Sequence, residues 1–214
     1  MDNQVNQIGR GQTFYGSATP DASNLGGVSL EGARKVFLNT DPTSSVTNIR
    51  KPRDQGDVKC VLVRNVSGIT LAAGQAVSWK SGYRERRVDG YITTDYQEIA
   101  GFVDDHIGSG GVQNNDLFWL IVEGDVLTKT PHTGAGFGKA SWSDGDVLFA
   151  LTAAASTAVD GTAGKLQAWV GTFTATQTTD GTAGKFAKYA IAKAKSAMTS
   201  GQTDTAVLIS VRRY

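Results

Sequence analysis

The run DVKCVLVRNVSG limits the fold of this chain more than any other part of its sequence. In an extended strand, successive side chains point to opposite faces of the sheet. Val58, Cys60 and Leu62 therefore share one face. Val61 and Val63 share the other face, so both faces of the strand are apolar. Because both faces need apolar cover, we expect this strand to lie at the centre of a β-structure.

Short apolar runs of a similar kind recur along the chain between clusters of turn-forming residues. The sequence holds 26 glycines and 4 prolines, and its Val, Thr and aromatic residues gather in short runs, which is typical of many short strands. The further strand candidates are ARKVFLN, QAVSW, RVDGYITT, EIAGFVDDHI, DLFWLIVEGDVLTKT, GDVLFALTA and KLQAWVGTFT. No alternating helical pattern requires a parallel sheet. The sequence therefore predicts a mainly β fold, a small β-barrel or sandwich domain with an extended N-terminal arm and long hairpin insertions.

Residues 1–27 carry isolated apolar side chains in a polar, glycine-rich background, which is too little apolar surface to form a core. We interpret them as an extended N-terminal arm, followed by one β-rich domain over residues 28–214. Phe14 and Tyr15 form an adjacent aromatic pair that can anchor the arm in a groove or across a sheet edge of a partner. The alternative is that these two aromatic side chains pack on their own domain.

The charge balance argues against two classes of partner. The chain has 21 Lys and Arg against 20 Asp and Glu, so no strong field draws it to nucleic acid or to an anionic membrane, and we expect neither as a partner. Cys60 is the only cysteine, which excludes an intrachain disulfide and fits folding in the cytoplasm. The N-terminus does not resemble a secretory signal. The longest apolar run, residues 117–122, is far shorter than the roughly 20 residues that span a bilayer, so we expect a soluble chain.

Few residues are of the kinds that form catalytic centres. The 2 histidines, His106 and His132, have unrelated, loop-like surroundings, and no common catalytic or phosphate-binding motif is present. We therefore expect no enzyme activity and no cofactor, with a hydrolase using distant carboxylates as the alternative. Asp104, Asp105 and His106 offer ligands for a metal ion, but an exposed loop at a strand end is the favoured interpretation, and we expect no metal site.

The densest group of positive charges is YRERR, which contains Arg84, Arg86 and Arg87. Such a group fits an acidic protein surface or nucleic acid, whereas a solvated loop or strand edge is the simpler interpretation. We retain these three arginines, together with Phe14 and Tyr15, as candidate contacts with a protein partner.

Two parts of the C-terminal half have weaker local signals. The hexapeptide DGTAGK occurs at residues 160–165 and again at 180–185, and its Asp-Gly predicts two similar hairpin turns, since two copies are too few for a solenoid. The stretch KFAKYAIAKAKSAM has alanines and lysines at helical spacing, yet its small residues also alternate as in a strand. The local pattern slightly favours a helix there, and TAVLISV predicts a final strand.

Four segments, taken in order, resemble the capsid decoration proteins of tailed phages, a family that includes the lambda head-decoration protein. The segments are VLVRNVSGITLAAGQAVSW, EIAGFVDDHIGSGGVQNNDLFWLIVEGDV, SWSDGDVLFA and YAIAKAKSAMTSGQTDTAVLISV. The likeness covers residues 57–211 and consists of spacing and residue character more than identity. It implies that Gly74 and Gly145 each form the turn that opens a strand. It also implies that YAIAKAKSAMT is a strand paired with TAVLISV rather than a helix.

The resemblance further implies a structural virion protein without a catalytic site. Proteins of this family bind the outside of an assembled icosahedral shell, usually as trimers at its threefold positions. We therefore expect a homotrimer that binds the major capsid protein on the outer capsid surface, stabilises the shell, and is made in the host cytoplasm. The alternative is a receptor- or glycan-binding head or tail fibre module, prompted by Trp119, Trp142 and Trp169.

Overall fold

The computed structural model describes residues 9–14, 30–43, 52–91, 99–129, 143–150, 166–168, 192–195 and 206–211 of the chain. These parts contain ten β-strands, and none of them forms a helix that is long and apolar enough to cross a membrane. The expected mainly β fold is therefore confirmed. The strands are β1 (Arg34–Thr40), β2 (Pro52–Asn65), β3 (Ala76–Trp79), β4 (Arg87–Asp89), β5 (Ile99–Val103), β6 (Leu117–Lys129), β7 (Val147–Ala150), β8 (Leu166–Ala168), β9 (Ala192–Ala194) and β10 (Ala206–Val211).

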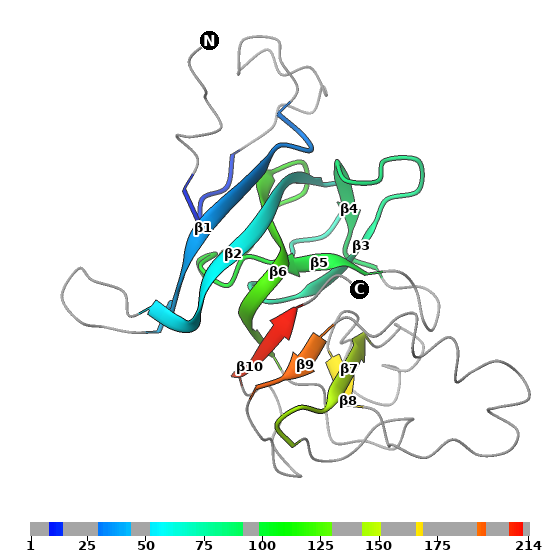
Figure 1. The fold of residues 1–214 in the computed structure, drawn as a ribbon. Coiled ribbons are helices and arrows are strands. Elements are labelled where there is room, and N and C mark those ends of the chain that lie inside the picture. The colour runs from blue at the N-terminus through cyan, green and yellow to red at the C-terminus, as the bar shows by residue number, and fades with distance from the viewer. Residues whose placement is uncertain are drawn as a thin grey trace, which may run out of the picture.

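Five strands close into a barrel (Figure 1). The ring runs through β2, β4, β3, β5 and β6, and it closes through the pairing of β6 with β2. Neighbours in the ring are antiparallel except β2 and β4, which pair in parallel at Arg64 and Asn65. The long strands β2 and β6 have 14 and 13 residues, so each can also pair with a strand outside the ring.

A second group of strands continues from the end of β6. Beyond the barrel β6 pairs with β10, and the sheet proceeds through β9 and β7 to β8, below the barrel in Figure 1. We call these four strands the extension. Gly124, where the pairing with β10 begins, has a φ of 123°, and a Cβ there would lie 2.8 Å from Cγ1 of Val58. Glycine is thus required where β6 passes close to β2.

Two apolar clusters cover opposite faces of β2 and β6, as the alternation in the sequence predicts. One cluster draws on all five barrel strands and fills the barrel interior; its members include Val61, Val63, Val77, Val88, Val103, Phe118 and Leu120. The other lies on the outer face and joins the barrel to the extension; its members include Val58, Cys60, Leu62, Trp119, Leu148, Ala192 and Val211. The prediction that the strand DVKCVLVRN is apolar on both faces and central is confirmed.

Two expectations drawn from the resemblance are also confirmed by the backbone, the strand in YAIAKAKSAMT only for residues 192–194. Gly74 and Gly145 have φ angles of +70° and +84°, and each precedes the start of a strand, β3 and β7 respectively. This left-handed region favours glycine, which has no Cβ to clash. β9 is antiparallel to β10, so the helix that the local pattern favours is wrong for residues 192–194, where long-range pairing overrides local propensity.

Part of the predicted arm lies against the barrel. We call residues 9–14 the N-terminal segment. Phe14 exchanges two backbone hydrogen bonds of 2.9 Å with Leu117 at the start of β6, and its side chain is half-buried against the outer apolar cluster. In the single chain, Phe14 therefore packs on its own domain, which is the alternative to anchoring the arm on a partner. Tyr15, His132, both copies of DGTAGK, Trp142 and Trp169 lie outside the described residues.

Candidate functional site

Among the residues that the structure describes, the most deeply buried group of ionisable side chains is Asp104, Asp105 and His106, in the loop that follows β5. Their side chains are 0%, 2% and 3% exposed, and their potential ligand atoms lie within 4.8 Å of one another. The expectation of an exposed loop at this place is therefore wrong. The loop is covered because partners from distant parts of the chain pack on it, including Thr40 of β1, whose Oγ1 lies 3.0 Å from Nε2 of His106.

Arg10 of the N-terminal segment is the first of these partners. Its Nη2 lies 2.8 Å from Oδ1 of Asp104 and 2.8 Å from Oδ1 of Asp105, and only 8% of its side chain is exposed. Its Nη1 donates to the backbone oxygen of Leu38 at 3.4 Å. The next residue, Gly11, donates its backbone N–H to Oδ2 of Asp104 at 3.0 Å. One short segment thus supplies a charge and a backbone donor to the same carboxylate.

Arg53 of β2 is the second partner. Its Nη1 lies 2.8 Å from Oδ2 of Asp105, and the same nitrogen donates to the backbone oxygen of Asp125 at 3.0 Å. Asp125 of β6 in turn pairs with Nζ of Lys195, just after β9, at 2.7 Å. These contacts form one ionic network that joins the N-terminal segment, the barrel and the extension. Its charged members are Arg10, Asp104, Asp105, Arg53, Asp125 and Lys195.

Within the ionic network, the carboxylates of Asp104 and Asp105 are satisfied by groups from the chain itself, whereas Oδ1 of Asp125 is buried without a hydrogen-bond partner among the described residues. Both oxygens of Asp104 and both oxygens of Asp105 accept hydrogen bonds or ion pairs from Arg10, Arg53, His106 or backbone N–H groups. Burial raises the pKa of Asp105, while Arg53 and the Leu127 N–H act in the opposite direction. A divalent cation at this place would lie beside two guanidinium groups, so the arrangement does not suit a metal site.

Cys60 lies in the outer apolar cluster and is 1% exposed. Burial raises the pKa of its thiol, and the nearby Asp104 carboxylate acts in the same direction. Because the thiolate is the nucleophilic form, this environment suits a core residue and not a reactive thiol.

The positive cluster YRERR contains one half-buried arginine and two exposed ones. Arg87 is half-buried: its Nε lies 3.2 Å from Oε2 of Glu31, and its guanidinium carbon lies 4.3 Å from the ring centroid of Tyr83. The side chain of Glu31 is only 5% exposed and also pairs with Nε of Arg64 in β2. For Arg87, the simple interpretation as a solvated charge is wrong, because Glu31 and Arg64 bring it into a buried ion pair.

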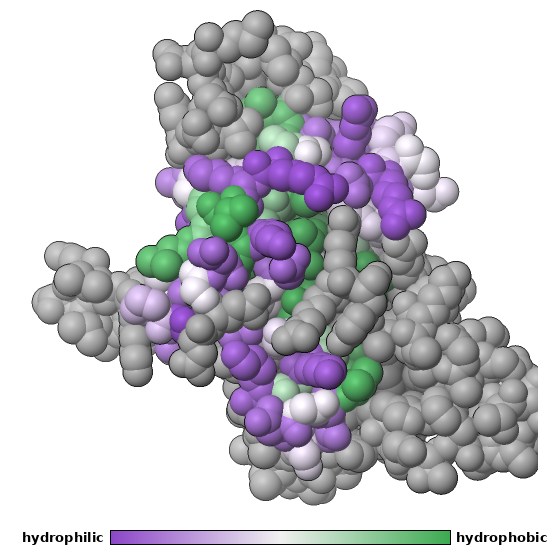
Figure 2. Space-filling model, viewed as in Figure 1, coloured by the Kyte–Doolittle hydropathy of each residue, from purple (hydrophilic) through white to green (hydrophobic). Residues whose placement is uncertain are grey.

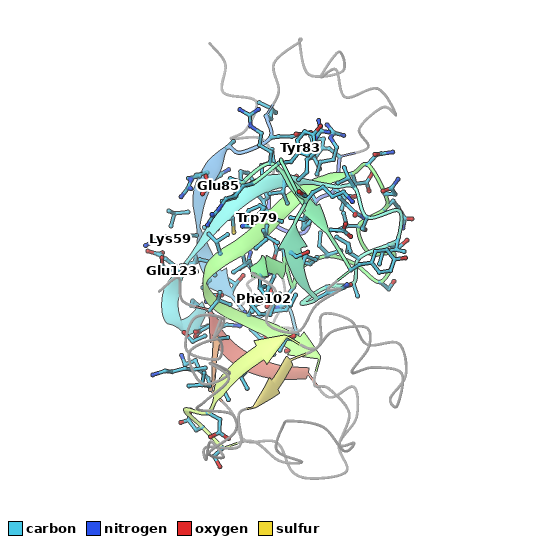
Figure 3. The ribbon with its side chains drawn as sticks, turned by 90° about the vertical axis from the view of Figure 1, so that its right-hand side faces the viewer. Lys59, Trp79, Tyr83, Glu85, Phe102 and Glu123 are labelled. Carbon is cyan, nitrogen blue, oxygen red and sulfur yellow. The ribbon has the colours of Figure 1, made fainter. Side chains whose placement is uncertain are left out.

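Arg84 and Arg86 are exposed at the same end of the barrel. They lie in the connection between β3 and β4, where backbone hydrogen bonds from Arg86 and Arg87 to the carbonyl of Tyr83 close the turn. Glu85 lies between them and pairs with Arg34 at 2.8 Å. Figure 3 places Tyr83 and Glu85 together at this end, with the exposed pair Lys59 and Glu123 farther along the side.

Trp119, one of the tryptophans that prompted a glycan-binding alternative, is fully buried. Its ring packs edge-on against Phe37 with a centroid distance of 5.2 Å. A sugar stacks on an exposed ring face, so Trp119 does not provide such a surface in this structure.

The residues that sequence reasoning missed are the partners of the buried charges, Arg10, Arg53, Glu31 and Arg64. Arg64 carried a usable signal, because it continues the alternating face of Val58, Cys60 and Leu62, where a charge needs a partner. Arg10 carried none, since its partner Asp104 lies 94 residues away along the chain.

No protein-family model matches the chain, and no curated protein is similar enough to it to serve as a relative. Any functional proposal therefore depends on the barrel, the ionic network and the exposed Arg84 and Arg86, together with the resemblance in sequence pattern.

Proposed function

We propose that this protein is a structural virion protein that binds the outer surface of an assembled phage capsid and stabilises it. The observation that carries the proposal is the exposure of Arg84 and Arg86 in the connection between β3 and β4, at an end of the barrel where neighbouring charges form ion pairs. The resemblance in the order, spacing and residue character of four sequence segments supports the same function. The partner implied is an acidic face of the major capsid protein.

Ion pairs order the charges around these two arginines. Arg87 and Arg64 are fixed by Glu31, Arg34 by Glu85, and Lys80 by Asp89 at 2.8 Å. Hydrophilic side chains gather across this end of the molecule in Figure 2. A docking surface that is already ordered loses less conformational entropy on binding than a mobile loop does.

The proposal includes a homotrimer as the binding unit. A trimer contacts several shell subunits at once. The weak contacts of its three copies therefore combine into tight binding to the shell. Light scattering of the isolated protein is expected to give about three times the chain mass of 22.6 kDa. A monomer that also occupies the shell singly would contradict the trimer.

Cosedimentation with expanded, undecorated capsids tests the proposed function. We expect saturable binding in a fixed ratio to the major capsid protein, and weaker binding as salt rises, because exposed charges are screened over about 8 Å at physiological ionic strength. The double variant Arg84→Gln and Arg86→Gln is expected to bind less well. The matched control, Lys59→Gln with Lys193→Gln, also removes two exposed positive charges and is expected to bind normally.

Absence of saturable shell binding at low salt would overturn the proposed function. Binding to host cells instead would favour a receptor-binding module. Equal loss of shell binding in both double variants would show that attachment depends on total charge and not on Arg84 and Arg86.

A further inference from the structure

The carboxylates of Asp104 and Asp105 form a recognition site for one arginine side chain. Arg10 reaches it with Nε and Nη2, at 3.2 Å and 2.8 Å from Oδ1 of Asp104, while the same Nη2 also reaches Asp105. Both carboxylates are almost completely buried, at 0% and 2% exposure. A planar guanidinium that contacts two carboxylates is a geometry that lysine does not reproduce.

The site also contacts and selects the backbone on the C-terminal side of Arg10. A Cβ at position 11 would lie 2.5 Å from the backbone oxygen of His106, so only glycine fits after the arginine. Three residues later, Phe14 pairs with Leu117 through backbone hydrogen bonds in both directions. Recognition by a charge, a required glycine and a strand-like backbone pairing resembles the binding of an extended peptide.

The barrel residues that contact this segment in the described structure are remote from it in sequence. Arg10 and Asp104 are separated by 94 residues, and the described structure resumes after Phe14 only at Leu30. The chain between these two residues can span at most about 55 Å. A compact chain of this length has a radius of gyration of about 17 Å, so the segment can also reach a neighbouring copy.

From these contacts we infer that Asp104, Asp105 and Leu117 form a peptide site that receives residues 9–14 of a second copy when copies assemble. Exchange of the segment preserves every contact, so its free energy depends mainly on how close the neighbouring copy is held. In dilute solution, the covalent link favours binding of a chain's own segment to its site. In an assembly, the segment of a neighbouring copy competes for the same site at a similar effective concentration. This inference concerns contacts between copies and does not depend on shell binding.

Cysteine pairing between different full-length chains tests the exchange. One chain carries Phe14→Cys, the other carries Leu117→Cys, and the two are co-expressed and then oxidised. Directly paired antiparallel residues of this kind have Cα atoms about 5.5 Å apart, within the range of a disulfide. We expect a disulfide-linked heterodimer, whereas a Phe14→Cys chain with Gly11→Val should form much less of it. A chain with both cysteines that links only within itself, together with no heterodimer in the mixture, overturns the exchange.

A second measurement avoids substitution of the buried Leu117. The full-length Arg10→Ala chain is titrated with a labelled peptide of residues 7–16, and binding is followed by fluorescence anisotropy. We expect this peptide to bind at least tenfold more tightly than the same peptide with Gly11→Val or Arg10→Lys. Tighter binding of the unmodified peptide supports the site even if Leu117→Cys fails to fold. Equal or undetectable binding of the three peptides overturns it.

Discussion

The barrel and the extension use the same local sequence plan but hold it in place differently. LAAGQAVSW and SWSDGDVLF each place a glycine turn before an apolar strand. A Cβ on Gly74 would lie 2.1 Å from the backbone oxygen of Leu127, whereas a Cβ on Gly145 would have no heavy atom of the described residues within 4 Å. The strand after Gly74 is one member of the closed ring, while the strand after Gly145 pairs with β8 and β9, which have three residues each. The comparison teaches that a turn signal fixes a local shape, and the neighbouring elements decide how firmly it is held.

Removal of a large buried side chain from each region should give the largest difference in stability between the barrel and the extension. Phe118→Ala opens a cavity inside the barrel, where Phe118 is fully buried, and should cost about 3–5 kcal/mol. Leu148→Ala, also at a fully buried position, should act mainly on the extension, because short strands open at lower free energy than long ones. Hydrogen exchange followed by mass spectrometry checks both. Equal loss of protection in β2 and β6 for the two variants would show that barrel and extension unfold as one unit.

Alanine at the two turn glycines should give the next largest difference. Left-handed backbone costs a residue with a Cβ about 1–2 kcal/mol, and this cost applies to both Gly74→Ala and Gly145→Ala. Gly74→Ala also forces a Cβ against the backbone of β6, which adds about 1–3 kcal/mol of overpacking. Urea unfolding measures the difference. Similar losses of unfolding free energy for the two variants would mean that β6 moves to accommodate the added methyl group without cost.

Substitution of single arginines at the end of the barrel should give a smaller difference in the free energy of unfolding. Arg87→Gln leaves the buried Glu31 with Arg64 as its remaining ion-pair partner and should cost about 1–2 kcal/mol. Arg84→Gln, at an exposed position, should change the free energy of unfolding by no more than about 0.5 kcal/mol. Thermal unfolding of the two variants at equal ionic strength checks the pair. A larger loss for Arg84→Gln would contradict our assignment of Arg87 as the arginine that contributes more to stability.

The smallest expected effect is a pH dependence at Asp116, which precedes β6. Burial raises the pKa of this carboxyl above its ordinary 3.8, while its hydrogen bond from the Gln113 N–H and the charge of Arg64 act in the opposite direction. A raised pKa means that the folded chain binds this proton more tightly than the unfolded chain does, so the stabilising contribution is lost as the pH rises through the folded pKa. Asp116→Asn has no such loss. We expect its stability to increase relative to the original chain between pH 4 and pH 7 in urea unfolding, and a constant difference would contradict the assignment.

Much of the fold could be predicted, because its signals are local. Alternation on both faces of β2 identified a central strand, and the positive φ angles of Gly74 and Gly145 agree with their expected turns. The C-terminal stretch could not be assigned from its own pattern, since alanine and lysine favour a helix. Its assignment as a strand came from the resemblance, and its pairing partner β10 explains why the strand wins.

The candidate sites were less predictable, because each depends on partners that meet only in the folded chain. The cluster of arginines is evident in the sequence, but no local pattern predicts that Arg87 is half-buried while Arg84 and Arg86 are exposed. The loop at Asp104 and Asp105 was expected to be exposed because adjacent carboxylates are usually solvated. Arg10 and Arg53 reverse that expectation by arriving from the N-terminal segment and from β2.

The sequence by itself determined that this chain is mainly β, which strand is covered on both faces, and where the glycine turns open β3 and β7. These properties depend on side-chain alternation and on the φ angle of single residues, which neighbours along the chain decide. Only the tertiary structure decided that the ring closes, that β6 passes from the barrel into the extension, and that the carboxylates after β5 are buried. The physical reason is that strand pairing and burial of charge are long-range: a carboxylate is stable in the interior only where a distant part of the chain brings a cation to it.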